Sequence, residues 1–360
     1  MSRVKFNPEL LMREDLRTLK PYQPHDYPGT IKLDANENPY PFPQEALAEI
    51  SAQLKQLAFP RYPDPMAEAL RQDIASYVGV QPEQVLMGNG SDELIFNLAM
   101  AFGSGGKVVI AGPTFSMYRI HSRIAGAEPV EVPRQQDFSI NPNVIDMAVK
   151  ATSARLVMLC SPNNPTGNGT SLQVLEEVLA NTNGVVVVDQ AYIEFGGEDC
   201  VPLLAKYPNL VILRTFSKAF GLAGLRIGYL LADETVVNAL LRIKQPYNLN
   251  SFSQVAGGVA LKYLPHFKDQ WQKIIADRDQ MITSLSQLPS LKVYPTNANF
   301  MLVHTDMDAN VLHRKLLEKN ILVRNLGRSL PNHLRISVGT TEENEQLLQA
   351  TKAIITNGVN

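Results

Sequence analysis

The sequence predicts an α/β protein with two parts, a large unit with a mostly parallel sheet between helices and a smaller α+β unit. Three observations support this prediction. Continuous apolar runs without polar alternation recur before residue 245, as expected for strands buried on both faces. Helix-like segments separate these runs, as crossovers between parallel strands require. After residue 245 the pattern changes to long helical segments followed by shorter strands.

Composition and charge exclude several classes of protein. The 360 residues, 45% of them hydrophobic, are enough for a sizeable core and for two domains. The net charge is −2, and no basic stripe or basic amphipathic helix indicates binding to nucleic acid or to a membrane surface. There is no signal-peptide core or membrane-spanning run, and Cys160 and Cys200 lack metal-type spacing. We therefore expect a cytoplasmic protein without a metal site.

Residues 1–43 are proline-rich and irregular, so we expect an extended arm that joins the small domain. Whether this arm touches a ligand or is purely structural stays open. Residues 44–245 are expected to form the large domain, and residues 246–360 the small C-terminal domain.

Two helices are expected after the arm. The first carries apolar residues three or four apart, at Leu47, Ile50, Leu54 and Leu57. Asp64 is expected to cap the second helix, with Pro65 at its first position and Gly79 at its end. Between them, Tyr62 lies in a proline-stiffened turn that would present its phenol rigidly.

A glycine loop links the strand predicted at 85–87 to the helix predicted at 94–102. The loop contains Gly90, Ser91 and Asp92, and free N–H groups at such a helix start bind anions. Because the third glycine of a dinucleotide fingerprint is absent, this loop favours a simple phosphate over NAD.

Four further apolar runs are followed by side chains with ligand chemistry. The runs cover 108–111, 156–160, 185–188 and 210–213, and the side chains are Phe115, Asn164, Asp189 with Tyr192, and Lys218. Because ligands bind at the carboxyl ends of strands in open α/β sheets, we expect these side chains to surround one ligand.

The segment 215–226 is the centre of the predicted site. Lys218 lies just past a strand end, beside the hydroxyls of Thr215 and Ser217 and eight residues before Arg226. A lysine shielded from water can lose its proton near neutral pH and attack an aldehyde, while hydroxyls and an arginine suit a phosphate. Pyridoxal phosphate needs both an amine and an anion cradle. A Ser/Thr–Lys hydrolase that uses Thr215 and Lys218 stays open on this segment alone.

The small unit is expected to contain a long helical segment from Gln254 to about Leu288, four strands, and a last helix with a Thr340–Glu343 capping box. The strands are expected at 291–294, 299–304, 321–324 and 334–338. Arg324 and Arg335 fall in these strands, where an arginine is costly unless it meets an anion. A structural salt bridge is the alternative for each arginine.

Assembled, these segments resemble the fold type I pyridoxal-phosphate aminotransferases, and most closely the histidinol-phosphate aminotransferase family. The similar motifs are Ser161 to Gly167, Asp189 to Phe195 and Ser217 to Arg226. The likeness runs from Pro21 to Thr340, which is nearly the whole chain.

The resemblance implies a role for each residue around the cofactor ring. Lys218 would hold pyridoxal 5'-phosphate covalently as a Schiff base, and Asp189 would keep the pyridine nitrogen protonated. Asn164 and Tyr192 would bond to the phenolic oxygen of the ring, while Phe115 would stack on its face. Gln190 is a departure, because the family more often has Glu there; we expect its side chain to point away from the ring.

The resemblance also implies which groups bind the phosphate of the cofactor. The groups are Gly90, Ser91, Asp92 through its backbone N–H, Thr215, Ser217, Arg226, and Tyr62 of the neighbouring subunit. A homodimer with shared sites would follow, with the N-terminal arm adding contacts between subunits.

For substrates, the resemblance implies L-histidinol phosphate with 2-oxoglutarate, or imidazole-acetol phosphate with glutamate in the biosynthetic direction. Tyr22, Asn36, Arg324 and Arg335 would bind them. Alternatives within the same fold are an aromatic amino-acid aminotransferase and a threonine-phosphate decarboxylase. A regulator with an aminotransferase-like domain would need a DNA-binding segment, for which the arm gives no basic helix.

Overall fold

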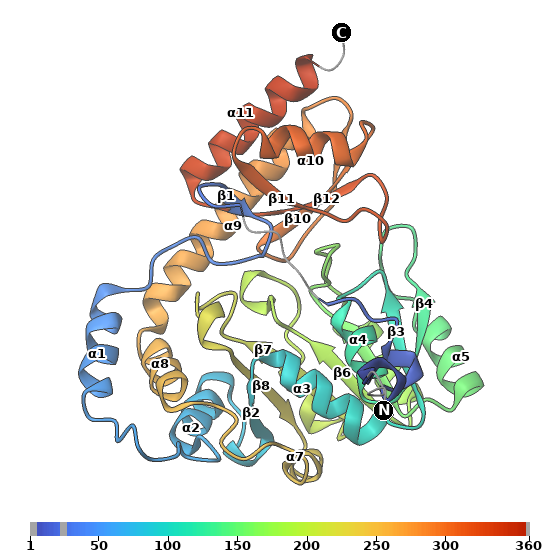
Figure 1. Cartoon of the computed structure of the whole chain (residues 1–360), viewed down its shortest axis with the longest axis vertical. Helices are drawn as coiled ribbons and strands as arrows, with labels where there is room; N and C mark the ends of the chain where they lie inside the picture. The colour runs from blue at the N-terminus through green and yellow to red at the C-terminus, as the bar shows by residue number, and fades with distance from the viewer. Residues whose placement is uncertain (1–5, 22–26, 358–360) are drawn as a thin grey trace, which may run out of the picture.

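The computed structural model describes residues 6–21 and 27–357, and it contains two sheets (Figure 1). The larger has seven strands in the order β2-β8-β7-β6-β5-β3-β4. Their bounds are β2 Val85–Asn89, β8 Ile227–Ala232, β7 Leu210–Thr215, β6 Val185–Asp189, β5 Leu156–Cys160, β3 Lys107–Gly112 and β4 Glu128–Pro133. From β7 to β4 every pair is parallel, which confirms the mostly parallel sheet.

Two strands of this sheet, β4 and β8, were not among the predicted strands. β4 contains two prolines and two glutamates, and it forms an edge of the sheet, where a missing N–H is tolerated. β8 runs antiparallel to both of its neighbours, β7 and β2, so the loop 216–226, with one short 3-10 helix, joins it to β7 instead of a long helical crossover.

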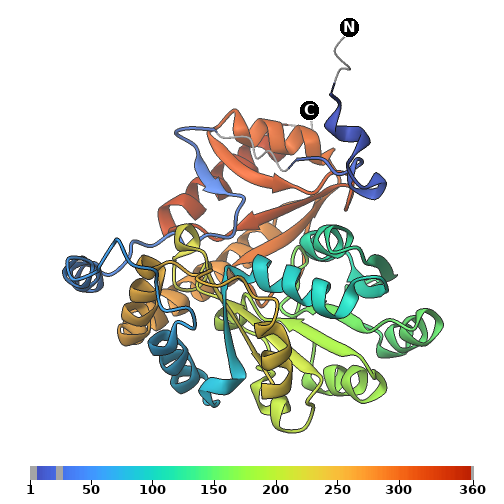
Figure 2. The ribbon, with the colours of Figure 1, turned by 60° about the horizontal axis from the view of Figure 1, so that its bottom comes forward.

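Both faces of the large sheet are buried, because successive residues of each central strand enter different hydrophobic clusters. Val157 and Val186 pack in one cluster, while Leu156 and Val187 pack in the other. The first face is covered by α2 (Glu68–Val78), α5 (Pro142–Thr152), α6 (Leu172–Asn181) and α8 (Ser251–Lys262). The second is covered by α3 (Ser91–Leu98), α4 (Met117–Ile124) and α7 (Glu234–Leu241). Figure 2 shows these layers on either side of the strands.

The first two helices differ from their prediction in detail. Helix α1 (Gln44–Leu54) buries Ala46 and Ile50, but Leu47 is exposed. Asp64 accepts the backbone N–H of Glu68 at 2.8 Å. Helix α2 begins only at Glu68, so the position predicted for Pro65 is wrong by three residues; its end at Gly79 is confirmed.

The smaller sheet has five strands in the order β1-β11-β12-β10-β9. Their bounds are β1 Ile31–Leu33, β11 Ile321–Asn325, β12 His333–Ser337, β10 Phe300–Thr305 and β9 Leu291–Val293. The helices of this unit are α9 (Leu264–Ser286), α10 (Ala309–Leu317) and α11 (Thr341–Asn357). The predicted long helix is two helices, α8 and α9, with Tyr263 between them and a proline in the first turn of α9.

The N-terminal arm is tied to both units. Arg13 donates to the backbone carbonyls of Arg123 and Ile124 at the end of α4, and Arg123 reaches back to Thr18 at 2.7 Å. Further along, β1 joins the small sheet beside β11. The residues that follow β1 therefore enter the space between the two sheets.

Candidate active site

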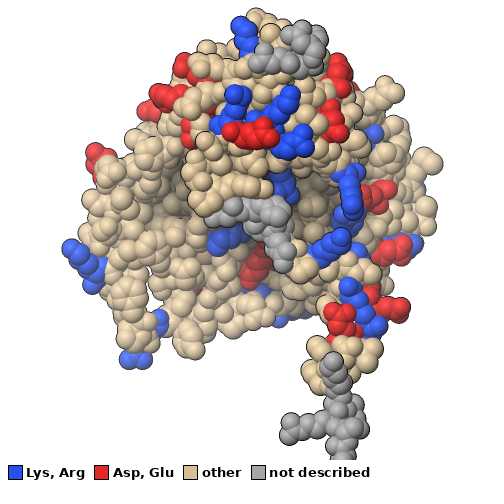
Figure 3. All heavy atoms as spheres, turned by 45° about the horizontal axis from the view of Figure 1, so that its top comes forward, with Lys and Arg blue, Asp and Glu red and all other residues tan. Residues whose placement is uncertain are grey.

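The candidate site lies where the carboxyl ends of β5, β6 and β7 meet the small sheet. Asp189 ends β6, and Lys218 follows β7. Arg335 of β12 crosses from the small sheet and donates to Asn164, beyond β5, at 2.8 Å. On the face shown in Figure 3 the surface is hollowed, and Lys and Arg atoms lie around the hollow.

Lys218 is placed for nucleophilic chemistry. Its Nζ donates to the backbone carbonyl of Ala35 at 2.9 Å. Burial, together with the positive charge of Arg335, lowers the pKa of Lys218 to about 8. An amine with such a pKa is partly neutral near physiological pH, which is the form that attacks an aldehyde.

Asp189 is buried and held by two donors. Tyr118 donates its hydroxyl to Oδ2 at 2.7 Å, and the N–H of Ala191 donates to Oδ1 at 3.1 Å. Burial raises the pKa of Asp189 to about 6, while the bond from Tyr118 opposes that rise. Such a carboxylate suits a cationic ring nitrogen, because it gains more from an opposite charge than an exposed one does.

Tyr118 was missed by the sequence analysis, although a signal was available. It lies three residues after Phe115, in the same short segment that follows the end of β3, and it is the second residue of α4. In the structure the rings of Phe115 and Tyr118 touch edge to face, 5.6 Å apart.

The hydroxyl of Tyr192 accepts hydrogen bonds from two side-chain amides. Asn36 donates to it at 3.1 Å and Asn164 at 3.3 Å. Asn36 was predicted to bind substrate, but it is only 1% exposed. Its side chain forms hydrogen bonds with Tyr192 and Ser337. Burial raises the pKa of Tyr192 to about 12, so its proton stays on the oxygen at neutral pH.

The start of α3 forms an anion site beside this group. Ser91 and Asp92 open the helix, so their N–H groups have no partner within it. A Cβ added to Gly90 would lie 2.6 Å from the guanidinium of Arg226, so only glycine leaves this cradle open. Arg226 pairs with Asp92 at 3.1 Å. This donor set, one arginine and a helix N-terminus, fits a phosphate.

Thr215 and Ser217 shape the turn that carries Lys218. Thr215 donates its hydroxyl to the carbonyl of Ile227 at 3.1 Å and accepts the N–H of Ser217 at 3.0 Å. Both residues are buried. The hydroxyl of Thr215 is therefore used by the loop itself in this structure.

Two predicted residues, Tyr62 and Arg324, lie outside the centre of the site. Tyr62 is 80% exposed and stacks on Tyr247 with ring centroids 4.5 Å apart. Arg324 faces Arg335 directly across the β11–β12 pair. Tyr22 lies outside the described residues.

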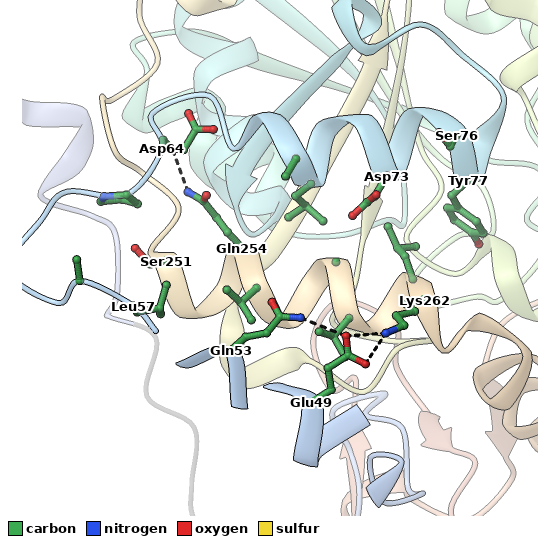
Figure 4. Close-up of a pocket in the computed structure, with 18 of the residues that line it drawn as sticks. Glu49, Gln53, Leu57, Asp64, Asp73, Ser76, Tyr77, Ser251, Gln254 and Lys262 are labelled. Carbon is green, nitrogen blue, oxygen red and sulfur yellow. Dashed lines mark hydrogen bonds and ion pairs between the residues drawn. The ribbon is translucent and has the colours of Figure 1, made fainter. Parts of the chain in front are cut away.

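A separate cavity of about 900 Å³ lies between α1, α2 and α8 (Figure 4), and its lining includes Tyr62 but not Lys218. Glu49 and Lys262 form an ion pair at 2.7 Å on its wall. Within residues 6–21 and 27–357, no cluster of His, Cys, Asp or Glu could hold a metal ion. No helix in the same ranges is long and apolar enough to cross a membrane.

A half-buried lysine, a buried acid under the same sheet edge and a phosphate site at a helix start together fit one class of protein, the pyridoxal-phosphate-dependent enzymes. Comparison with known proteins agrees. Residues 28–350 match the family model described as aminotransferase class I and II.

Comparison with individual proteins shows which kind of aminotransferase the chain resembles. The chain is 45% identical to histidinol-phosphate aminotransferase 1 of Carboxydothermus hydrogenoformans, over 97% of this chain and 100% of that protein. It is 40% identical to the enzyme of that name from Thermoanaerobacter pseudethanolicus, over 96% and 99% of the two chains. The solved structure of the Sinorhizobium meliloti histidinol-phosphate aminotransferase, in complex with pyridoxal-5'-phosphate, has a TM-score of 0.83 at 26% identity and covers 90% of each chain.

The chain belongs to the class I and II aminotransferases and, within them, to the histidinol-phosphate aminotransferase family. The predicted fold class, aminotransferase activity in histidine biosynthesis and pyridoxal 5'-phosphate as cofactor are confirmed at this level. When bound, this cofactor withdraws electrons from the carbon that bears the substrate amine.

Proposed function

We propose that this chain exchanges an amino group between L-histidinol phosphate and 2-oxoglutarate, giving imidazole-acetol phosphate and L-glutamate, with the reverse direction used in biosynthesis. The observation that carries this proposal is the arginine pair on the small sheet. Arg324 and Arg335 lie directly opposite each other, and like charges so placed repel unless an anion lies between or above them. Both substrates of this reaction are anions.

The surroundings of the site residues support the following roles. Lys218, with a pKa of about 8, would hold the cofactor through its aldehyde and would serve as the base and acid that moves a proton between the reacting carbons. Asp189 would hold the proton on the pyridine nitrogen, Asn164 and Tyr192 would bond to the phenolic oxygen, and Phe115 would cover the ring. The phosphate would be held by Gly90, Ser91, Asp92, Ser217 and Arg226, and Thr215 would join them by turning its hydroxyl from the carbonyl of Ile227 to the phosphate. Substrate anions are bound by Arg324, Arg335 and Tyr22.

We also propose that two copies of the chain share their sites, with Tyr62 reaching the cofactor phosphate of the neighbour. The support is exposure of apolar surface near Tyr62. Phe59 and Tyr62 are 79% and 80% exposed, and Tyr247, which stacks on Tyr62, is 41% exposed. A second copy would remove these rings from water.

The division into an arm at 1–43, a large domain at 44–245 and a small domain at 246–360 is likewise a proposal. It is supported by the two sheets, although β1 of the arm belongs to the small one. Cytoplasmic location is proposed because Cys160 and Cys200 are free and buried, as in a reducing compartment.

A substrate panel tests the proposed reaction. The purified protein, loaded with pyridoxal 5'-phosphate, is offered histidinol phosphate, phenylalanine, tyrosine and threonine phosphate with 2-oxoglutarate. We expect glutamate to form fastest with histidinol phosphate. Faster turnover of phenylalanine would show an aromatic aminotransferase, and carbon dioxide from threonine phosphate would show a decarboxylase. A Lys218→Ala variant should be inactive with every donor.

A further inference from the structure

The hydroxyl of Tyr192 is enclosed by a hydrogen-bond network that reaches into the arm and the small sheet. Its two direct partners are Asn36, from the arm, and Asn164, from the loop after β5. Exposure is 4% for Tyr192, 1% for Asn36 and 7% for Asn164. Bulk water therefore does not decide how this hydroxyl is oriented.

The amide of Asn36 is fixed in one orientation by Ser337. The hydroxyl of Ser337 accepts the backbone N–H of Asn36 at 2.9 Å and donates to its side-chain Oδ1 at 3.0 Å. With Oδ1 engaged in this way, the NH₂ group of Asn36 faces Tyr192. Asn299 holds the backbone of Asn36 by donating to its carbonyl at 3.1 Å.

The amide of Asn164 is fixed in the same way by Arg335. Nη1 of Arg335 donates to Oδ1 of Asn164 at 2.8 Å, so the NH₂ group of Asn164 also faces Tyr192. Arg335 and Ser337 are two apart on β12, so they lie on one face of that strand. One face of one strand therefore orients both amides.

These contacts restrict the direction in which the Tyr192 hydroxyl can donate its hydrogen bond. A phenol oxygen offers two lone pairs and one proton. The N–H groups of Asn36 and Asn164 occupy both lone pairs, so the hydroxyl can only donate to a further partner. In the proposed placement of the cofactor, that partner is the phenolic oxygen of the ring.

We propose that Asn36 is a positioning residue, which makes Tyr192 an obligate hydrogen-bond donor to the cofactor ring oxygen. This inference rests on the proposed function of the site, and it gives Asn36 a role other than substrate contact. A donated hydrogen bond stabilises the anionic form of the ring oxygen, so it holds the pKa of the bound chromophore low.

The test replaces Asn36 by its isostere, in the Asn36→Asp variant. The new carboxylate can only accept a hydrogen bond where the amide donated one. The Tyr192 hydroxyl is therefore expected to donate to this carboxylate instead of to the cofactor ring oxygen. We expect the pKa of the visible chromophore of the holoenzyme, measured by absorbance against pH, to rise by about one to two, the size of a bond to a charged group.

The same substitution in a Tyr192→Phe variant distinguishes loss of the Tyr192 hydrogen bond from the electrostatic effect of the new buried carboxylate. Other charged or titratable groups around Tyr192 are Arg335, Cys160 and Asp189, and they are unchanged in every variant. In a Tyr192→Phe background, Asn36→Asp should give no further rise, because there is no hydroxyl to redirect. An equal rise in both backgrounds would overturn the proposal, as would no rise in the native background.

The Asn36→Gly variant is a control for disruption of the local backbone. Asn36 has a φ of 55°, a left-handed conformation that glycine adopts freely. Asn36→Gly removes the donor without adding an acceptor, so its rise should be smaller than that of Asn36→Asp; the reverse order would contradict the proposal. If the unmodified protein binds no cofactor and shows no visible band, the proposed function itself fails instead.

Discussion

Tyr118 donates its hydroxyl to Oδ2 of Asp189 at 2.7 Å, and both side chains are removed from water, at 0% and 3% exposure. The bond stabilises the carboxylate form of Asp189 against the rise in pKa that burial causes. Without it, Asp189 would compete more strongly for the proton that the pyridine nitrogen needs.

Replacing Tyr118 by Phe should therefore slow the reaction. Loss of one hydrogen bond to a charged group costs about 1.5 kcal/mol, which corresponds to about a 10-fold lower kcat. Steady-state kinetics with histidinol phosphate measure it. The matched control is Tyr263→Phe, whose hydroxyl bonds to Glu49 far from the site, and which should keep its kcat. Equal kcat in the two variants would contradict the role given to Tyr118.

Lys218 should reduce the stability of the cofactor-free protein. Its pKa falls from 10.5 to about 8 on folding, so the folded state disfavours the charged form. The penalty is fully present below pH 8, up to about 3 kcal/mol, and it disappears as the pH rises to 10.5. Lys218→Met should raise the free energy of unfolding in urea at pH 7 and leave it unchanged above pH 10.5. A destabilised variant at pH 7 would show that the lysine is not penalised by burial.

Hybrid dimers should reveal whether Tyr62 serves the neighbouring site. Lys218→Ala and Tyr62→Ala proteins, each with little activity alone, are unfolded together and refolded as a mixture. If Tyr62 acts across the dimer, each hybrid contains one intact site, because the native lysine and native tyrosine meet there. We expect about half of the chains to pair as hybrids at equal mixing, and activity to reappear. Activity that stays at the level of the separate variants would place Tyr62 in its own subunit's site.

Arg324 should bind the phosphorylated substrate. It is more exposed than Arg335, which bonds to Asn164 deep in the site. Arg324→Gln should raise KM for histidinol phosphate about 10-fold or more, the value of one charge-assisted bond, with a smaller change for glutamate. Arg314→Gln on α10, which loses only an exposed pair with Glu318, is the control. A larger effect on glutamate would assign Arg324 to the carboxylate.

The central strands were predictable because apolar runs such as 185–188 have one stable environment, the middle of a parallel sheet. The residues at their ends were predictable for the same reason, since topology brings strand ends together. β4 was missed because its prolines and glutamates lack the apolar signature, and it is tolerated only at an edge.

Partners that depend on tertiary packing could not be predicted. Ser337 lies 301 residues from Asn36, and nothing local indicates that their side chains meet. The carbonyl of Ala35 that receives Lys218 is a backbone group, and backbone groups carry no sequence signal. The exposure of Leu47 likewise depends on where α8 packs against α1, which periodicity alone does not determine.

The central claim is that Lys218 holds the cofactor aldehyde. Reduction of the holoprotein with borohydride fixes that link, and peptide mass spectrometry then locates it. We predict one modified peptide containing Lys218 and none from the Lys218→Ala variant. A pyridoxyl group on another lysine, with Lys218 unmodified, would contradict the account.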